Sequence, residues 1–287
     1  MKFVKNLTNQ CRALINIILE VSLTGGGPGV PKIKVADELL YYEDSGDMCG
    51  GSTLLLLHGA GGSSCQWEKV IGELAEGHRV LALDLPGHGN SSGRGSRSVN
   101  SYVKVVRSFT AALELPNLIL CGHSLGGAIA MEYALKYPGV LQALVLVSTG
   151  ARLKVAPLFL EFCLEGNMEK LQILLSKYAF SPGTPLVQIR RWQKQWGFPP
   201  REIVYGDFLA CSSFDRMEDI RKIKAPTLII CGDEDLMTPL KYSTYLADRI
   251  KDSRLEVIPD GGHMLMVEKP RELNRAISQF AGELLKE

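Results

Sequence analysis

Two glycine-bounded serines are the sequence's first candidates for covalent chemistry. The pattern GxSxG occurs as GNSSG around Ser91 and as GHSLG around Ser124. Such a serine can attack an acyl carbon when a sharp turn from a strand into a helix lifts its hydroxyl above a sheet. The apolar segment NLILC precedes Ser124 and the helical pattern AIAMEYALK follows it, whereas Ser91 lies in a polar, glycine-rich loop. The sequence therefore predicts Ser124 as a nucleophile and Ser91 as a loop residue.

A serine hydroxyl is a weak nucleophile at neutral pH, so it needs a histidine to take its proton and a carboxylate to orient that histidine. His263 is the candidate base, because it follows the last predicted strand in the loop PDGGHM. The other histidines, at 58, 78, 88 and 123, are interpreted as buried or solvated groups without a catalytic role. The acid should lie between serine and histidine in the chain. Asp233 and Asp235 both meet this condition; Asp235 lies farther into its loop and can reach across the sheet edge, while Glu234 is expected to face solvent.

The negative charge that develops on an attacked carbonyl oxygen needs backbone N–H donors. In strand–turn–helix sites, one donor is the residue after the nucleophile, here Leu125, and the other comes from the loop after an earlier strand. The segment LLLLHGAGGSS at 54–64 fits that loop and makes Ala60 the candidate second donor. A phosphate-binding loop is the alternative, but the segment has neither a GK[ST] ending nor a GxGxxG frame.

Short apolar runs that alternate with helical patterns must position these candidates, and this alternation is typical of a parallel sheet built from crossover units. Several runs are apolar throughout, as expected for strands covered on both faces. The predicted strands are Lys32–Val35, Leu39–Glu43, Thr53–Leu57, Val80–Asp84, Leu118–Cys121, Leu144–Ser148, Thr227–Cys231 and Leu255–Pro259. The predicted helices are Gln66–Ala75, Val99–Leu115, Leu125–Lys136, Pro239–Ile250 and Arg271–Lys286. The fold class is therefore α/β, with a mostly parallel central sheet flanked by helices.

The segment 151–222 interrupts this alternation. It has no core-type strand but contains helical stretches rich in large apolar residues, at Phe159–Leu164, Leu171–Phe180 and Val187–Trp196. We expect it to form a helical cap over the carboxyl edge of the sheet, where open α/β sheets bind ligands. Its aromatic residues could line a substrate pocket or merely bury the cap against the core. These candidate lining residues are Phe159, Phe162, Trp192 and Trp196.

The cap would divide the core into residues 32–150 and 223–287, and an extension would occupy residues 1–31. The apolar stretch Ala13–Leu23 superficially resembles a signal peptide, but Asn16 and Glu20 interrupt it and no AxA-like cleavage site follows. It is also shorter than the ~20 residues that span a bilayer. We expect a short helical extension on a Gly/Pro linker and no stable membrane insertion.

Charge and cysteine usage narrow the classes of partner. The formal net charge is +1 and no long basic run is present, so nucleic-acid binding has no evident electrostatic source. The chain has 7 cysteines, none in a CxxC pair, which argues against a disulfide framework or a zinc site. This usage predicts a reducing compartment and a cytoplasmic protein. The expected partner is a small-molecule ester substrate, without a metal or organic cofactor.

Motifs spread along the chain resemble the α/β-hydrolase superfamily, specifically its small bacterial carboxylesterase-like branch. They occur in that family's order, as HGAGGSSCQW at 58–67, DLPGHGNSS at 84–92, GHSLGG at 122–127, APTLIICGDEDLMTP at 225–239 and GGHMLMVEKP at 261–270. The resemblance runs from about residue 32 to the end and implies the α/β-hydrolase fold with a helical cap. By similarity, the acid is the third residue beyond Gly232, which is Asp235.

The resemblance implies a serine esterase that acts through an acyl-serine intermediate. The serine at position 124 separates the chain from haloalkane dehalogenases and epoxide hydrolases, which carry aspartate as the nucleophile at that position. Thioesterase, lactonase and cofactor-free perhydrolase activity remain alternatives on the same triad, because the fold does not fix the substrate. A small-molecule receptor that retains the fold is the alternative outside enzymes.

Overall fold

One eight-stranded sheet forms the centre of the part of the chain that this computed structural model describes, residues 31–46, 51–195 and 199–285. The strands lie in the order β1-β2-β4-β3-β5-β6-β7-β8. Their bounds are Lys32–Val35 (β1), Glu38–Asp44 (β2), Thr53–Leu57 (β3), Arg79–Leu83 (β4), Leu118–His123 (β5), Ala143–Val147 (β6), Thr227–Gly232 (β7) and Ser253–Ile258 (β8). The β1–β2 and β2–β4 pairs are antiparallel, and all pairs from β4 to β8 are parallel. The predicted α/β class with a mostly parallel sheet is confirmed.

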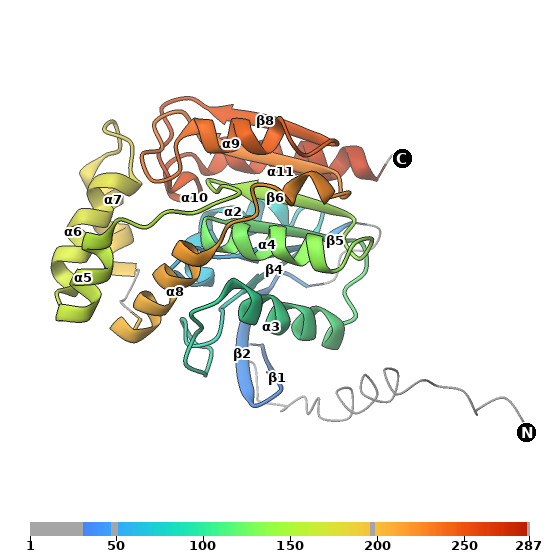
Figure 1. Ribbon diagram of the computed structural model, residues 1–287. Helices are drawn as coiled ribbons and strands as arrows, with labels where there is room; N and C mark the ends of the chain where they lie inside the picture. Colours follow the sequence, from blue (N-terminus) through green and yellow to red (C-terminus); the bar gives the residue numbers. More distant parts are fainter. Residues whose placement is uncertain (1–30, 47–50, 196–198, 286–287) are drawn as a thin grey trace, which may run out of the picture.

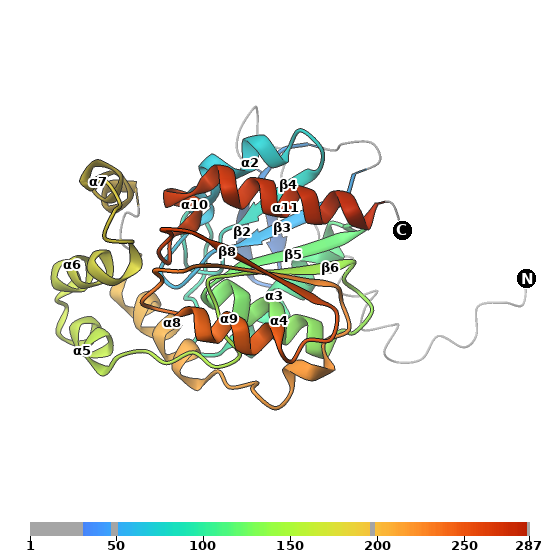
Figure 2. The ribbon, with the colours of Figure 1, turned by 90° about the horizontal axis from the view of Figure 1, so that it is seen from above.

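Helices cover both faces of this sheet (Figures 1 and 2). In Figure 2, one face carries α2 (Glu68–Leu74) and α11 (Pro270–Leu284). The opposite face carries α3 (Val99–Ala112), α4 (Leu125–Lys136) and α9 (Leu240–Ala247). Three short helices also belong to the described core: η1 (Ser64–Trp67), η2 (Ile220–Lys222) and α10 (Leu265–Glu268). Because both faces are covered, every residue of β3, β5, β6 and β7 is buried.

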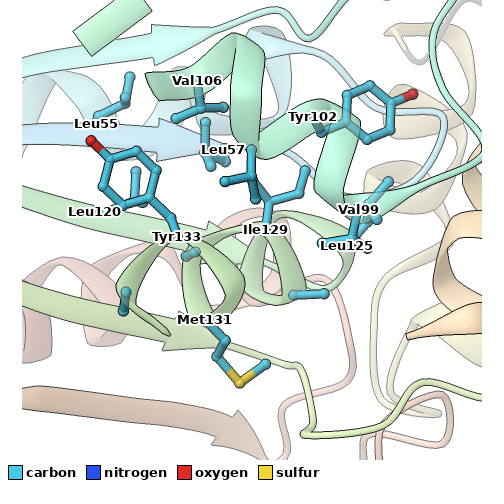
Figure 3. Packing of buried hydrophobic residues seen from close by; sticks show 14 of the residues in the cluster. Leu55, Leu57, Val99, Tyr102, Val106, Leu120, Leu125, Ile129, Met131 and Tyr133 are labelled. Carbon is cyan, nitrogen blue, oxygen red and sulfur yellow. The ribbon is translucent and has the colours of Figure 1, made fainter. Parts of the chain in front are cut away.

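Packing between the sheet, α3 and α4 fixes the start of α4 (Figure 3). Leu55 and Leu57 of β3 and Leu120 of β5 lie in one fully buried cluster with Val106 of α3 and Ile129 of α4. Full burial of one such side chain contributes roughly 1.5–3 kcal/mol. The helix that follows the predicted nucleophile is therefore held rigidly against the sheet.

Between β6 and β7, the described residues form four further helices, which we call the cap helices. They are α5 (Pro157–Glu165), α6 (Met168–Ala179), α7 (Leu186–Gln195) and α8 (Arg201–Ser213). Side chains from α5, α6 and α8 share a cavity with residues that follow β3, β5, β7 and β8, so these helices lie over the carboxyl ends of those strands. The sequence predicts helical stretches at α5, α6 and α7 but misses α8. In α8, Gly206 and Asp207 interrupt the apolar pattern of the buried face.

The predicted N-terminal extension lies outside the described residues except for Pro31, as does Trp196. Among the helices that the structure does describe, none combines the length and apolar character needed to cross a bilayer.

Candidate active site

Ser124 lies at the sharp turn between β5 and α4. Its backbone has φ 51° and ψ −113°, a conformation that a residue with a side chain adopts only under strain. Three hydrogen bonds hold the strained peptide: Ser124 N–H donates to the Val147 carbonyl (3.0 Å), and its own carbonyl accepts from Ala128 N–H (3.1 Å) and Thr149 Oγ1 (2.8 Å). This geometry places Ser124 on the wall of the cavity beneath the cap helices.

Glycines on both sides of the serine allow this turn to close. A Cβ atom added at Gly122 would collide with the carbonyl oxygen of Gly126, and one added at Gly126 would collide with the carbonyl oxygen of Leu57. Both obstacles are backbone atoms and cannot rotate away. The GxSxG spacing is thus a packing requirement of β3, β5 and α4.

Gly126→Ala should therefore lower the free energy of unfolding by about 1–3 kcal/mol or more, as overpacking does in tight cores. It should also lower any activity that depends on Ser124, because the turn must shift to admit the methyl group. Gly72→Ala is the matched control, since Gly72 is exposed within α2 and a Cβ there meets nothing within 4 Å. That change should raise stability by about 0.5–1 kcal/mol. Urea unfolding of the two variants measures both effects, and a Gly126→Ala protein as stable as the wild type would contradict the packing argument.

The structure brings His263 and Asp235 together. His263 Nδ1 lies 2.9 Å from Asp235 Oδ2, and both side chains are buried. Asp235 Oδ1 accepts from the N–H groups of Met237 and Thr238, each at 2.8 Å, and Oδ2 accepts from Thr238 Oγ1 at 2.7 Å. Because a carboxylate accepts, His263 Nδ1 carries the proton and Nε2 keeps its lone pair. The imidazole therefore has the tautomer that a general base requires.

The electrostatics keep Asp235 ionised. Burial raises the pKa of this carboxyl, but the neighbouring His263 and the hydrogen bonds from His263 and Thr238 outweigh burial and bring the pKa to about 2. The carboxylate thus stays charged at neutral pH and can stabilise an imidazolium at His263.

The two acidic neighbours of Asp235 point elsewhere. Asp233 is exposed, and no hydrogen bond to its side chain is found within the described residues. The structure corrects the expectation that Glu234 faces solvent. Glu234 is half-buried and accepts a hydrogen bond from Ser181 Oγ at 2.5 Å, because α6 leads the chain directly past this turn. Of these three acidic residues, Asp235 alone has a hydrogen bond to His263 within the described part of the chain.

His263 and Ser124 line the same cavity, and the ring of His123 packs against the ring of His263. The His123 and His263 rings lie 4.7 Å apart, and His123 Nε2–H donates to the His263 carbonyl at 3.0 Å. Burial holds the pKa of His123 well below its usual value, so this ring is neutral. The neutral His123 ring therefore places no positive charge beside the His263 ring.

Neither of the two amides predicted to stabilise an oxyanion has a backbone acceptor among the described residues. In the loop after β3, Gly61 N–H donates to Asp207 Oδ2 (2.8 Å) and Gly62 N–H donates to the Gly59 carbonyl (3.0 Å). No hydrogen bond from the Ala60 or Leu125 amide to another described residue is found. Ala60 lines the cavity with Ser124, and Leu125 N–H belongs to the first turn of α4, where helix amides have no internal acceptor.

The cavity above these groups has a volume of about 400 Å³ and a mainly apolar wall. Of the predicted lining residues, Phe159 lies on this wall. Trp192 lines a smaller adjoining cavity of about 50 Å³ that also touches Ser124 and His263. Phe162 is half-buried and lines neither cavity, and Trp196 lies outside the described residues.

The sequence interpretation missed several residues of this wall. They are Leu153, Leu158, Leu174, Tyr178, Phe208, Leu236 and Met237. Leu174 and Tyr178 are four residues apart in α6 and so share one helix face, a spacing that could have identified them. Leu236 follows the acid directly and is 57% exposed, unusual for a large apolar side chain.

The family described as alpha/beta hydrolase fold matches residues 52–270 of the chain. The putative carbamate hydrolase RutD of Azorhizobium caulinodans is 29% identical over 271 residues, covering 89% of this chain and 99% of that protein. The pimeloyl-[acyl-carrier protein] methyl ester esterase of Nitrosospira multiformis is 27% identical, covering 84% of this chain and 98% of the relative. The solved structure of a thermophilic esterase is 32% identical with a TM-score of 0.75, and the match covers 89% of this chain and 98% of that one.

Proposed function

We propose that this chain, which belongs to the α/β-hydrolase family, hydrolyses carboxylic esters of small or medium acyl groups through an acyl-serine intermediate. The observation that carries the proposal is the buried Asp235–His263 pair, whose free ring nitrogen shares an apolar cavity with the strained Ser124. Fixed backbone strain of this kind is concentrated at functional sites.

The chemistry follows from the positions of these groups. His263 Nε2 takes the proton of the Ser124 hydroxyl as Oγ attacks the acyl carbon, and the carbonyl oxygen gains the negative charge. The amides of Ala60 and Leu125 are the donors for that oxyanion. His263 then gives the proton to the departing alcohol, which leaves an acyl ester on Ser124. Water attacks this ester by the same route in reverse, and the acid is released.

The cavity supports an ester whose acyl group is largely uncharged. Its wall is mainly apolar, and a volume of about 400 Å³ accommodates a small or medium chain. Two relatives, the methyl ester esterase and the thermophilic esterase, carry ester hydrolysis in their names. Carbamate hydrolysis is the second candidate, because the Azorhizobium relative is named for it and a carbamate carbonyl needs the same nucleophile and donors.

A substrate panel separates these activities. Purified protein is assayed with p-nitrophenyl esters of graded acyl length, with the matching acyl-CoA thioesters, with lactones, and with an aryl carbamate. The Ser124→Ala variant measures the background for each substrate. We expect kcat/KM to be highest for an ester of intermediate length; a higher kcat/KM for the carbamate or thioester would replace the ester assignment while keeping the triad.

Phe159→Ala should change acyl-length preference, because Phe159 lines the cavity and its ring lies 5.7 Å from that of Phe208. Removing it should shift the ratio of kcat/KM for long over short esters by about 10-fold, the scale of 1–3 kcal/mol per pocket contact. Phe162→Ala is the matched control, since this phenylalanine of the same helix lines neither cavity. Equal ratios in the two variants would refute a role for α5 in substrate selection.

A further inference from the structure

A buried aspartate in the cap helices contacts the loop that carries Ala60. Asp207 of α8 is fully buried. Its Oδ2 accepts from Gly61 N–H and faces His88 Nε2, each at 2.8 Å. Its Oδ1 accepts from the Tyr102 hydroxyl at 2.6 Å. One carboxylate therefore ties together α8, α3, the loop after β4 and the loop after β3.

The contacts of His88 show that this is a buried ion pair. His88 Nδ1 lies 3.0 Å from the Pro86 carbonyl and Nε2 lies 2.8 Å from Asp207 Oδ2. Both partners are acceptors, so both ring nitrogens carry protons and the ring is positively charged. Burial lowers the pKa of His88, but the Asp207 carboxylate outweighs burial and raises the pKa above its usual value. The pair balances the charge that Asp207 brings into the interior.

The loop after β3 is held from the other side by His58. The pKa of His58 is lowered to about 3, first by burial and then by the neighbouring His88 charge, so its ring is neutral. Its Nδ1–H donates to the Gly59 carbonyl at 2.8 Å, and its Nε2 accepts from Leu85 N–H at 3.0 Å. The His58 and His88 rings lie 4.8 Å apart. Residues 59 and 61 are thus both anchored, and the amide between them, that of Ala60, is left without a partner among the described residues.

We propose that Asp207 is a positioning residue for the oxyanion loop, which holds the Ala60 amide toward the reacting carbonyl by fixing the Gly61 N–H. This inference rests on the proposed function. It gives the cap helices a role in the chemical step. Asp207 would act through the oxyanion loop, since it lines neither of the cavities that contain Ser124. A carboxylate suits this role, because it accepts from Gly61 and from charged His88 with the same oxygen.

Asp207→Ala and Tyr102→Phe form the test pair. Both variants delete a buried hydrogen bond to the same network, so both should lower thermal stability. Of the two changes, only Asp207→Ala removes the acceptor of the Gly61 N–H, since the Tyr102 hydroxyl binds the other carboxylate oxygen. Active sites are titrated with a fluorophosphonate, so that kcat is calculated per reactive Ser124. A purely structural role for Asp207 would change the fraction of active protein but not kcat per titrated site.

We expect kcat per titrated site to fall by ~10- to 100-fold in Asp207→Ala with little change in KM, somewhat less than the loss of an oxyanion donor itself. Tyr102→Phe should stay within ~3-fold of wild type, the scale of a contact outside the transition state. Asp207→Asn keeps an acceptor for Gly61 and should recover part of the loss. Equal kcat per titrated site in Asp207→Ala and Tyr102→Phe would overturn the proposal.

Asp207→Asn also keeps the test decisive if Asp207→Ala does not fold. The neutral amide binds Gly61 less strongly and cannot balance a charged His88, so its kcat per titrated site should lie clearly below that of Tyr102→Phe. A value equal to that of Tyr102→Phe would then refute the positioning role. Wild-type protein without ester turnover or labelling would instead refute the proposed function, which keeps the two failures distinguishable.

Discussion

Ser124→Ala should lower ester turnover by at least ~10⁴-fold, the scale on which triads lose activity when one member is removed. The residue lies partly exposed on the cavity wall, so the change removes one hydroxyl and no core volume. The melting temperature should therefore stay within a few degrees of the wild type, on the order of the shift that 1 kcal/mol produces. Turnover of the best ester in the panel, measured beside a thermal melt, provides both values.

His263→Ala gives the control for this prediction. Its loss should be similarly severe, and the double variant should be little worse than either single one, because triad members act as a unit. Losses that multiplied in the double variant, or substantial turnover by folded Ser124→Ala, would show that these residues do not share one mechanism.

Asp235→Asn should lower turnover by up to ~10⁴-fold, because an amide can present N–H to the imidazole and favour the wrong tautomer. Asp235 is the carboxylate that contacts His263 Nδ1, at 2.9 Å. Asp233→Asn is the matched control two residues away: it makes the same chemical change on an exposed side chain and should leave turnover within ~3-fold of wild type. Comparison of kcat for the two variants measures the difference, and the reverse order of losses would show that the acid is misassigned.

The core could be predicted from the sequence because its signals are local. The bounds of β3 and of α4 agree with the apolar run before residue 58 and with the helical pattern after Ser124. Ser124, Asp235 and His263 each lie within a few residues of the end of such a run. Chain order and strand ends therefore predicted all three candidates, and the structure places two of them, Asp235 and His263, within hydrogen-bond distance.

The cavity wall and the buried His88–Asp207 pair could not be predicted, because they depend on contacts between segments that are distant in the sequence. Phe159 and Phe162 look equivalent in sequence, but the packing of α5 turns only the first into the cavity. The sequence does not reveal the role of His88, because its partner, Asp207, lies 119 residues away in a helix that the apolar pattern does not predict. A buried charge pair leaves no periodic signal, since each half appears as an ordinary polar residue until the fold brings them together.

Mass spectrometry of the protein after reaction with a fluorophosphonate tests the central claim most directly. The reagent forms a stable phosphonyl ester only with a serine whose proton is removed as it attacks and whose oxyanion is stabilised. We predict a single adduct on the peptide that contains Ser124, at a rate that collapses in His263→Ala while that variant remains folded. No adduct on native protein, or an adduct on another serine such as Ser91, would contradict the account.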